Sequence, residues 1–187
     1  MATVQQLMTA EEFARLPDNG RLLELVRGEV VEMNLPKPRH GEVCSNVHFH
    51  MRLYCQASKR GRVICNDAGV ITERDPDSVR GPDVCYISFA KAPPGPLGYK
   101  YFDPPPEVVF EVLSPDDRPA RTLAKIGEYL RVGVETVVVL DPDEQTVFVY
   151  EHDGSQRELH LDDTLTLTAI APDCSIEVSK FFEHATA

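Results

Sequence analysis

The stretch VVFEVLSP, residues 108–115, decides the fold class of this 187-residue chain. Five of its first six residues are apolar, which is typical of a strand buried on both faces of a sheet. The Ser-Pro-Asp sequence at 114–116 predicts the start of a helix that runs to about Val132. A second apolar run at 136–140 predicts another buried strand. This strand–helix–strand order predicts a crossover unit with two parallel strands.

An N-terminal helix and a hairpin are expected ahead of this unit. Thr9 and Glu12 form a capping-box pattern, which predicts a short helix that runs to Leu16. The segments 22–26 and 29–33 flank an Arg-Gly pair and predict a β-hairpin.

The spacing of apolar residues predicts the remaining elements. They are a helix over 40–57, strands at 62–65, 69–72, 84–87 and 146–150, and a small helix near Phe181. We therefore expect an α/β (α+β) fold with a mixed central sheet of five or more strands flanked by helices. The length suits one domain, and since no linker or repeat interrupts residues 1–187, we expect a single domain.

The composition of the chain limits the cellular environment and the binding partners that we expect for it. Five cysteines without a C-x-x-C pair argue against both a disulfide framework and a thiolate zinc site. The N-terminus shows no signal-peptide pattern, and the apolar runs are too short to span a bilayer. We expect a soluble, cytoplasmic protein without a membrane partner.

The net charge is −11, from 30 acidic and 19 basic residues. Proteins that hold duplex DNA by neutralising phosphates usually carry a basic footprint. The charge therefore argues against strong nonspecific DNA binding. It does not exclude a small catalytic site that contains a metal ion.

Asp83 and Glu111 are the candidate metal ligands. Asp83 stands at the entrance of the strand at 84–87, and Glu111 lies inside the apolar run at 108–113. A carboxylate in a buried strand is costly unless a partner compensates its charge. Mg²⁺ or Mn²⁺ is one such partner, because both prefer hard oxygen ligands. A structural ion pair with an arginine is an equally weighted alternative.

Lys125 lies on the predicted helix that follows Glu111. At 100° per residue, Leu123, Ile126 and Leu130 define the apolar face, and Lys125 lies away from its centre. A solvated surface lysine is the simpler interpretation. A functional role requires this side of the helix to face the carboxyl ends of the strands.

These residues together resemble a large bacterial family of predicted endonucleases, the Uma type. That family belongs to the PD-(D/E)XK superfamily, whose fold is restriction-endonuclease-like. The resemblance covers most of the chain and rests on Pro82-Asp83, the segment EVLSP at 111–115, Lys125, Tyr129, Gly133, the segment VVVLDP at 137–142, the segment LELVRGE at 23–29 and His40-Gly41.

The resemblance also implies roles. In the superfamily a lysine usually stands two residues after the Glu, but here that position is Leu113. In the Uma type the lysine has moved to the next helix, which corresponds to Lys125. Arg121 stands where many relatives carry an acidic residue. Glu24 matches an upstream carboxylate of the family and is a further candidate ligand or orienting residue, with a solvent-facing hairpin residue as the alternative.

The expected function is that of a Mg²⁺- or Mn²⁺-dependent endonuclease that hydrolyses phosphodiester bonds of DNA. The candidate catalytic residues are Glu24, Asp83, Glu111 and Lys125. The alternative is an inactive nuclease-fold protein that acts as a binding or assembly module, which the charge of −11 and Leu113 favour. A homodimer is expected by analogy with restriction-endonuclease-like proteins.

The histidines at 40, 48 and 50 suggest a rival site. His48 and His50 loosely resemble the H-x-H strand of a metal-binding β-barrel. The local periodicity is helical, however, which separates these two side chains by about 200° around the helix. They are therefore not expected to share a metal. His40 begins the helix and matches a family position, so phosphate contact and capping both stay open.

Overall fold

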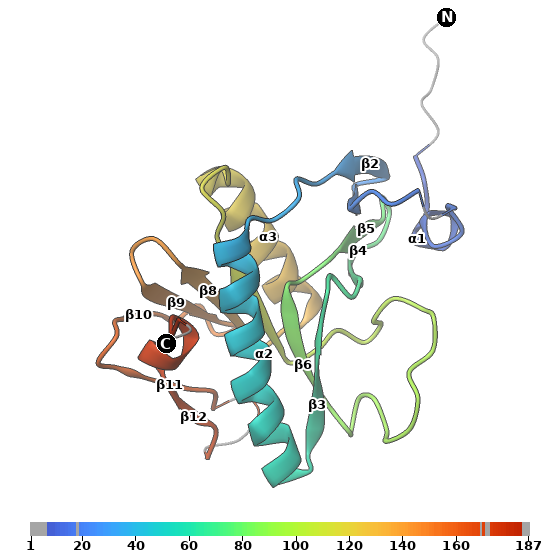
Figure 1. Ribbon diagram of the computed structural model, residues 1–187. Coiled ribbons are helices and arrows are strands. Elements are labelled where there is room, and N and C mark those ends of the chain that lie inside the picture. The colour runs from blue at the N-terminus through green and yellow to red at the C-terminus, as the bar shows by residue number, and fades with distance from the viewer. Residues whose placement is uncertain (1–6, 18, 169, 171–172, 185–187) are drawn as a thin grey trace, which may run out of the picture.

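The computed structural model describes residues 7–17, 19–168, 170 and 173–184 (Figure 1). Two α-helices and two sheets dominate it. In chain order the elements are α1 (Ala10–Phe13), β1 (Leu23–Val26), β2 (Glu29–Glu32), α2 (Pro38–Ser58), β3 (Gly61–Cys65), β4 (Val70–Glu73), β5 (Ser78–Arg80), β6 (Val84–Ser88), β7 (Val108–Val112), α3 (Pro119–Val132), β8 (Thr136–Asp141), β9 (Thr146–Glu151), β10 (Gln156–Leu159), β11 (Thr164–Thr166), β12 (Ser175–Glu177) and the 3₁₀ helix η1 (Val178–Phe181).

The central sheet has six strands in the order β10-β9-β8-β7-β6-β3. β7 and β8 are parallel and are joined through α3, whereas the other neighbouring strands are antiparallel. The predicted crossover unit and the mixed α/β architecture are therefore confirmed. A second sheet, in the order β2-β1-β5-β4, contains the predicted hairpin.

Each face of the central sheet is covered by a different helix. In Figure 1, α2 crosses in front of this sheet and α3 lies behind it. The pleat of β7 directs Phe110 into the core beneath α2 and Val109 into the core beneath α3. β7 is thus buried on both faces, which explains its nearly continuous apolar sequence.

The N-terminal elements form a third, smaller core. Ala10 and Phe13 of α1 pack with Leu25 of β1 and Val79 of β5. The capping box at Thr9 and Glu12 is present as predicted. The helix itself ends at Phe13 rather than Leu16. The packing of this core holds β1 and β5 together, and these strands reach the candidate site from the opposite side to β7.

The predicted start of the helix after Glu111 needs correction, and one strand was not predicted. The helix after Glu111 begins at Pro119 with Arg118 as its N-cap, so residues 114–116 do not cap it. Asp117 instead accepts a hydrogen bond from the backbone N–H of Ser114, which closes a local turn. β5 was not predicted, because three residues are too short for a periodic signal.

Within the described residues, no helix combines the length and hydropathy needed to cross a membrane.

The predicted apolar face of α3 was wrong at one end. Leu123 is 59% exposed, whereas Ile126 and Tyr129 are buried. The helix packs against β4 as well as the central sheet, so its inward surface is rotated towards Lys125 and Glu128. The lysine expected to be off the apolar face is therefore turned into the molecule.

This orientation of α3 predicts different losses of stability when two of its side chains are truncated to alanine. Ile126→Ala should lower the free energy of unfolding by about 2–4 kcal/mol, because it leaves a cavity in the core. Leu123→Ala, the control, should change it by less than about 0.5 kcal/mol. Urea denaturation followed by circular dichroism measures both. Equal losses would contradict the orientation described for α3.

Candidate active site

Asp83 directly precedes β6, and Glu111 lies on the neighbouring strand β7. β6 and β7 pair with Val84 opposite Phe110. If that register continues by one residue, Asp83 lies opposite Glu111. Cross-strand partners of this kind are close neighbours, so an extension of the β6–β7 pairing by one residue would bring the two predicted metal ligands together.

A backbone hydrogen bond orients Asp83. Its Oδ2 accepts the N–H of Val112 at 2.7 Å. Its Oδ1 lies 3.4 Å from Nε2 of His40, in the first turn of α2. Both side chains are largely buried. The carboxylate thus bridges the central sheet and the start of α2.

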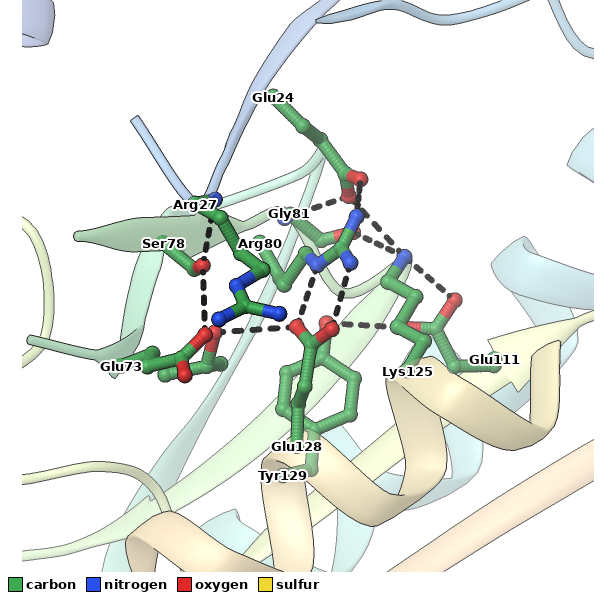
Figure 2. A network of polar contacts seen from close by, with 11 residues as sticks. Glu24, Arg27, Glu73, Ser78, Arg80, Gly81, Glu111, Lys125, Glu128 and Tyr129 are labelled. Carbon is green, nitrogen blue, oxygen red and sulfur yellow. Dashed lines mark hydrogen bonds and ion pairs between the residues drawn. The ribbon is translucent and has the colours of Figure 1, made fainter. Parts of the chain in front are cut away.

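Lys125 lies between Glu24 and Glu111 (Figure 2). Its Nζ is 2.9 Å from Oε2 of Glu111, 3.2 Å from Oε1 of Glu24 and 3.0 Å from the carbonyl oxygen of Gly81. An ammonium group has three N–H donors, and these three oxygens can accept all of them. Lys125 is therefore not the solvated surface lysine of the simpler interpretation.

Glu24 is also inside the protein, with only 5% of its surface exposed. Its Oε1 accepts the backbone N–H of Gly81 at 3.0 Å, and its Oε2 lies 2.9 Å from Nη1 of Arg80. The solvent-facing alternative for Glu24 is therefore wrong. The carboxylate joins the hairpin sheet to Lys125, as Figure 2 shows.

Arg80 extends this network to α3. Its Nε and Nη2 donate to the two carboxylate oxygens of Glu128, at 2.6 and 2.7 Å. A two-point contact of this type is stronger and more directional than a single ion pair. On the next residue of α3, the hydroxyl of Tyr129 donates to Oε1 of Glu111 at 2.9 Å. Both oxygens of Glu111 therefore have donors.

Burial and neighbouring charges have opposite effects on the pKa values of this cluster. Burial alone would lower the pKa of Lys125, but Glu111 and Glu24 raise it, so the lysine remains an ammonium. Burial raises the pKa of Glu111, and the charge of Lys125 opposes this effect. Burial would also raise the pKa of Glu24, but Lys125 and Arg80 outweigh it and the pKa is lowered.

Asp67 adds a further carboxylate beside Asp83. Burial, followed by the charge of Asp83, raises its pKa to about 6. Its backbone has a positive φ of 54°, and it packs against Gly81, where an added Cβ would come within 2.8 Å of the Asp67 Cβ. Gly81 is thus required for this close approach between the β3–β4 turn and the entrance of β6.

The four residues predicted for the site lie near one another in the structure, together with residues that the sequence did not mark. The four are Glu24, Asp83, Glu111 and Lys125, and the structure brings all of them into one cluster. Tyr129 was named as part of the family resemblance without being given a role. Asp67 and Arg80 carried no pattern that marks them, because their proximity results from folding of the β3–β6 segment. His48 and His50 both lie on α2, as the helical interpretation predicted.

The side chains present fit a hard divalent cation. Asp83, Glu111, Glu24 and Asp67 are carboxylates from four different segments, and oxygen ligands of this type suit Mg²⁺ and Mn²⁺. Partial burial and mutual repulsion, seen in the raised pKa of Asp67, make added positive charge favourable.

The family model for Uma2, described as "Putative restriction endonuclease", matches residues 10–179. The chain belongs to the Uma2 family. The matched range includes every candidate residue discussed above. No curated protein matches this Uma2 member.

A solved structure supports the fold of this Uma2 protein. It is described as a "putative nuclease belonging to DUF820" from Anabaena variabilis ATCC 29413. The two chains superpose with a TM-score of 0.82 over 94% of this chain and 97% of the other, at 21% sequence identity. The predicted restriction-endonuclease-like fold is thereby confirmed.

The contacts of Lys125 predict a large stability loss when the ammonium is removed. Without divalent cations, Lys125→Met should lower the free energy of unfolding by about 3 kcal/mol, because it leaves Glu111 and Glu24 without their shared partner. Lys125→Met/Glu111→Leu should lose less than the single variant. Arg121→Met on the exposed side of α3 is the control and should change stability by less than about 0.5 kcal/mol. If Lys125→Met matched this control in urea denaturation, the described pairing would be wrong.

Proposed function

We propose that the protein is a metal-dependent nuclease that hydrolyses phosphodiester bonds of DNA with Mg²⁺ or Mn²⁺. The observation that carries this proposal is the position of Asp83 at the entrance of β6, beside the strand β7 that carries Glu111, with the ammonium of Lys125 at hydrogen-bonding distance from Glu111. Membership of a family described as a "Putative restriction endonuclease" supports the same activity.

Asp83 and Glu111 would hold the cation against the scissile phosphate. A bound divalent cation supplies Lewis acidity to the phosphate oxygens and lowers the pKa of a coordinated water. Asp83 keeps one oxygen on the Val112 N–H, which leaves the other oxygen to act as a ligand. Tyr129 and Lys125 orient the carboxylate of Glu111 by donating to both of its oxygens.

Lys125 would act on the reacting phosphate or on the attacking water. Its positive charge is maintained inside the site, since Glu111 and Glu24 keep it protonated. An ammonium in a partly dry site stabilises negative charge that develops on the phosphate. It can also donate a hydrogen bond that orients the water. Glu24 and Arg80 position Lys125 through the network described above.

Two exposed arginines at the start of α3 could contact phosphates despite the net charge of −11. Arg118 and Arg121 are exposed at the start of α3, the helix that supplies Lys125. We assign them contacts with phosphates that flank the scissile bond. A bound cation would further invert the field of the carboxylates. An acidic protein can in this way bind DNA at one place.

The net charge also favours a second candidate, an inactive module that keeps the fold for binding or assembly. The two functions differ in their need for a metal. In an inactive module the Lys125–Glu111 ion pair has only a structural role and no metal is needed. A nuclease must bind a cation at Asp83 and Glu111. The predictions of a homodimer and of a cytoplasmic location stay predictions under either function.

Mn²⁺ titration by calorimetry separates the two functions. The wild type should bind Mn²⁺, and Asp83→Asn should not, because the amide can still accept from Val112 N–H but lacks the charge that a cation requires. Asp143→Asn in the exposed β8–β9 turn is the matched control and should bind as the wild type does.

The same proteins should then be compared for cleavage of supercoiled plasmid DNA. The wild type should cleave with Mg²⁺ or Mn²⁺, and Asp83→Asn, Glu111→Gln and Lys125→Met should each lose on the order of 100-fold or more in rate. Absence of Mn²⁺ binding in the wild type at millimolar concentrations would reject the nuclease and favour the inactive module.

A further inference from the structure

His40 and Cys44 stand one turn apart on α2 and face Asp83. Nε2 of His40 is 3.4 Å from Oδ1 of Asp83, and Nδ1 of His40 is 3.4 Å from Sγ of Cys44. Ligand atoms of the three residues all lie within 4.8 Å of one another. All three residues are partly buried. The nuclease chemistry proposed above uses Asp83 but leaves this histidine without a role.

The separation of His40 and Asp83 suits two ligands of one ion. Metal–nitrogen and metal–oxygen bonds of about 2.1 Å place two such ligand atoms about 3.0 Å apart at 90° and about 3.4 Å apart at a tetrahedral angle. The observed distance of 3.4 Å lies in this range and is long for a hydrogen bond. Little movement would be needed for both atoms to reach a shared cation.

The other ring nitrogen of His40 has a partner that fits this role. A neutral imidazole that donates its Nδ1–H to the sulfur of Cys44 leaves the lone pair of Nε2 directed towards Asp83. A hydrogen bond at the second nitrogen is the usual way in which proteins orient a metal-binding histidine. Since Cys44 contacts Nδ1, we treat it as the residue that orients His40 rather than as a ligand.

The charges around Asp83 leave room for a cation on this side. Lys125 has its three donors directed at Glu111, Glu24 and Gly81. Asp83 instead has the Val112 N–H on one oxygen and His40 beside the other. A divalent ion at Oδ1 of Asp83 would therefore not need to displace the ammonium of Lys125.

We propose that His40 is a metal ligand together with Asp83, and that this nitrogen ligand makes the site select Mn²⁺ over Mg²⁺. The inference rests on the proposed metal-dependent nuclease and names its cation. Mn²⁺ accepts an imidazole nitrogen more readily than Mg²⁺ does, because Mg²⁺ strongly prefers oxygen ligands and retains its waters. A site made of carboxylates alone would discriminate less between the two ions.

The first test uses the wild-type protein with MnCl₂ alone. Pulsed electron paramagnetic resonance of bound Mn²⁺ detects magnetic coupling to a coordinated ¹⁴N nucleus. We expect an imidazole ¹⁴N signal. Bound Mn²⁺ without such a signal would overturn the role of His40, while leaving a carboxylate metal site and the proposed nuclease intact. Absence of bound Mn²⁺ would reject both proposals.

Two variants then assign the signal and the selectivity. His40→Gln should abolish the ¹⁴N coupling and weaken Mn²⁺ binding by roughly tenfold or more, while Mg²⁺ binding changes by less than about threefold. His40→Asp replaces the nitrogen with an oxygen ligand and should narrow the ratio of Mn²⁺ to Mg²⁺ affinity. Calorimetry gives both affinities.

His50→Gln is the matched control. His50 is a partly buried histidine on the same helix, ten residues and therefore about 15 Å along the axis from His40. It should keep the ¹⁴N coupling and both affinities, and thermal unfolding checks that each variant is folded. Retention of the coupling in His40→Gln, or its loss in His50→Gln, would show that His40 is not the ligand. Because the wild-type spectrum decides the point by itself, the proposal stays testable even if a variant does not fold.

Discussion

The candidate site depends on the contacts that the ammonium of Lys125 makes with three oxygen atoms. Glu111 comes from β7, Glu24 from β1 and Gly81 from the entrance of β6, and Lys125 from α3 contacts all three. Burying two carboxylates side by side is unfavourable unless a cation lies between them. The lysine therefore holds the central sheet, the hairpin sheet and the crossover helix in one arrangement.

Arg80 strengthens this arrangement by contacting two further carboxylates of the cluster. Its two-point contact with Glu128 fixes β5 against α3, and its contact with Glu24 fixes the hairpin. Glu24 is thus held by Arg80 and Lys125 together. The remaining carboxylates, Asp83 and Asp67, lie towards α2 and His40. The site accordingly has a side of satisfied ion pairs and a side suited to an added cation.

Several features were predictable because their signals are local. The apolar run of β7, the helix that follows and the run of β8 define a parallel crossover, and the Arg-Gly turn defines the hairpin. Glu111 was recognisable because a single charged residue in a buried strand needs a partner. The length of α1, the short β5 and the start of α3 were not predictable, since tertiary packing and one side-chain hydrogen bond at Asp117 decide them.

The sequence by itself predicted the fold class, because periodicity and residue type can be read along the chain, and it predicted Asp83 and Glu111 as candidate ligands. The roles of Glu24 and Lys125 came from the family resemblance. Only the tertiary structure decided that Lys125 is buried, that Glu24 faces inward and that His40 meets Asp83. Helical periodicity shows which residues share a face of the helix, but it does not show what that face packs against. Because α3 packs between two sheets, the side of α3 that faces inward could not be predicted from the sequence. Contacts between segments as distant as residues 24, 83 and 125 exist only after the chain has folded.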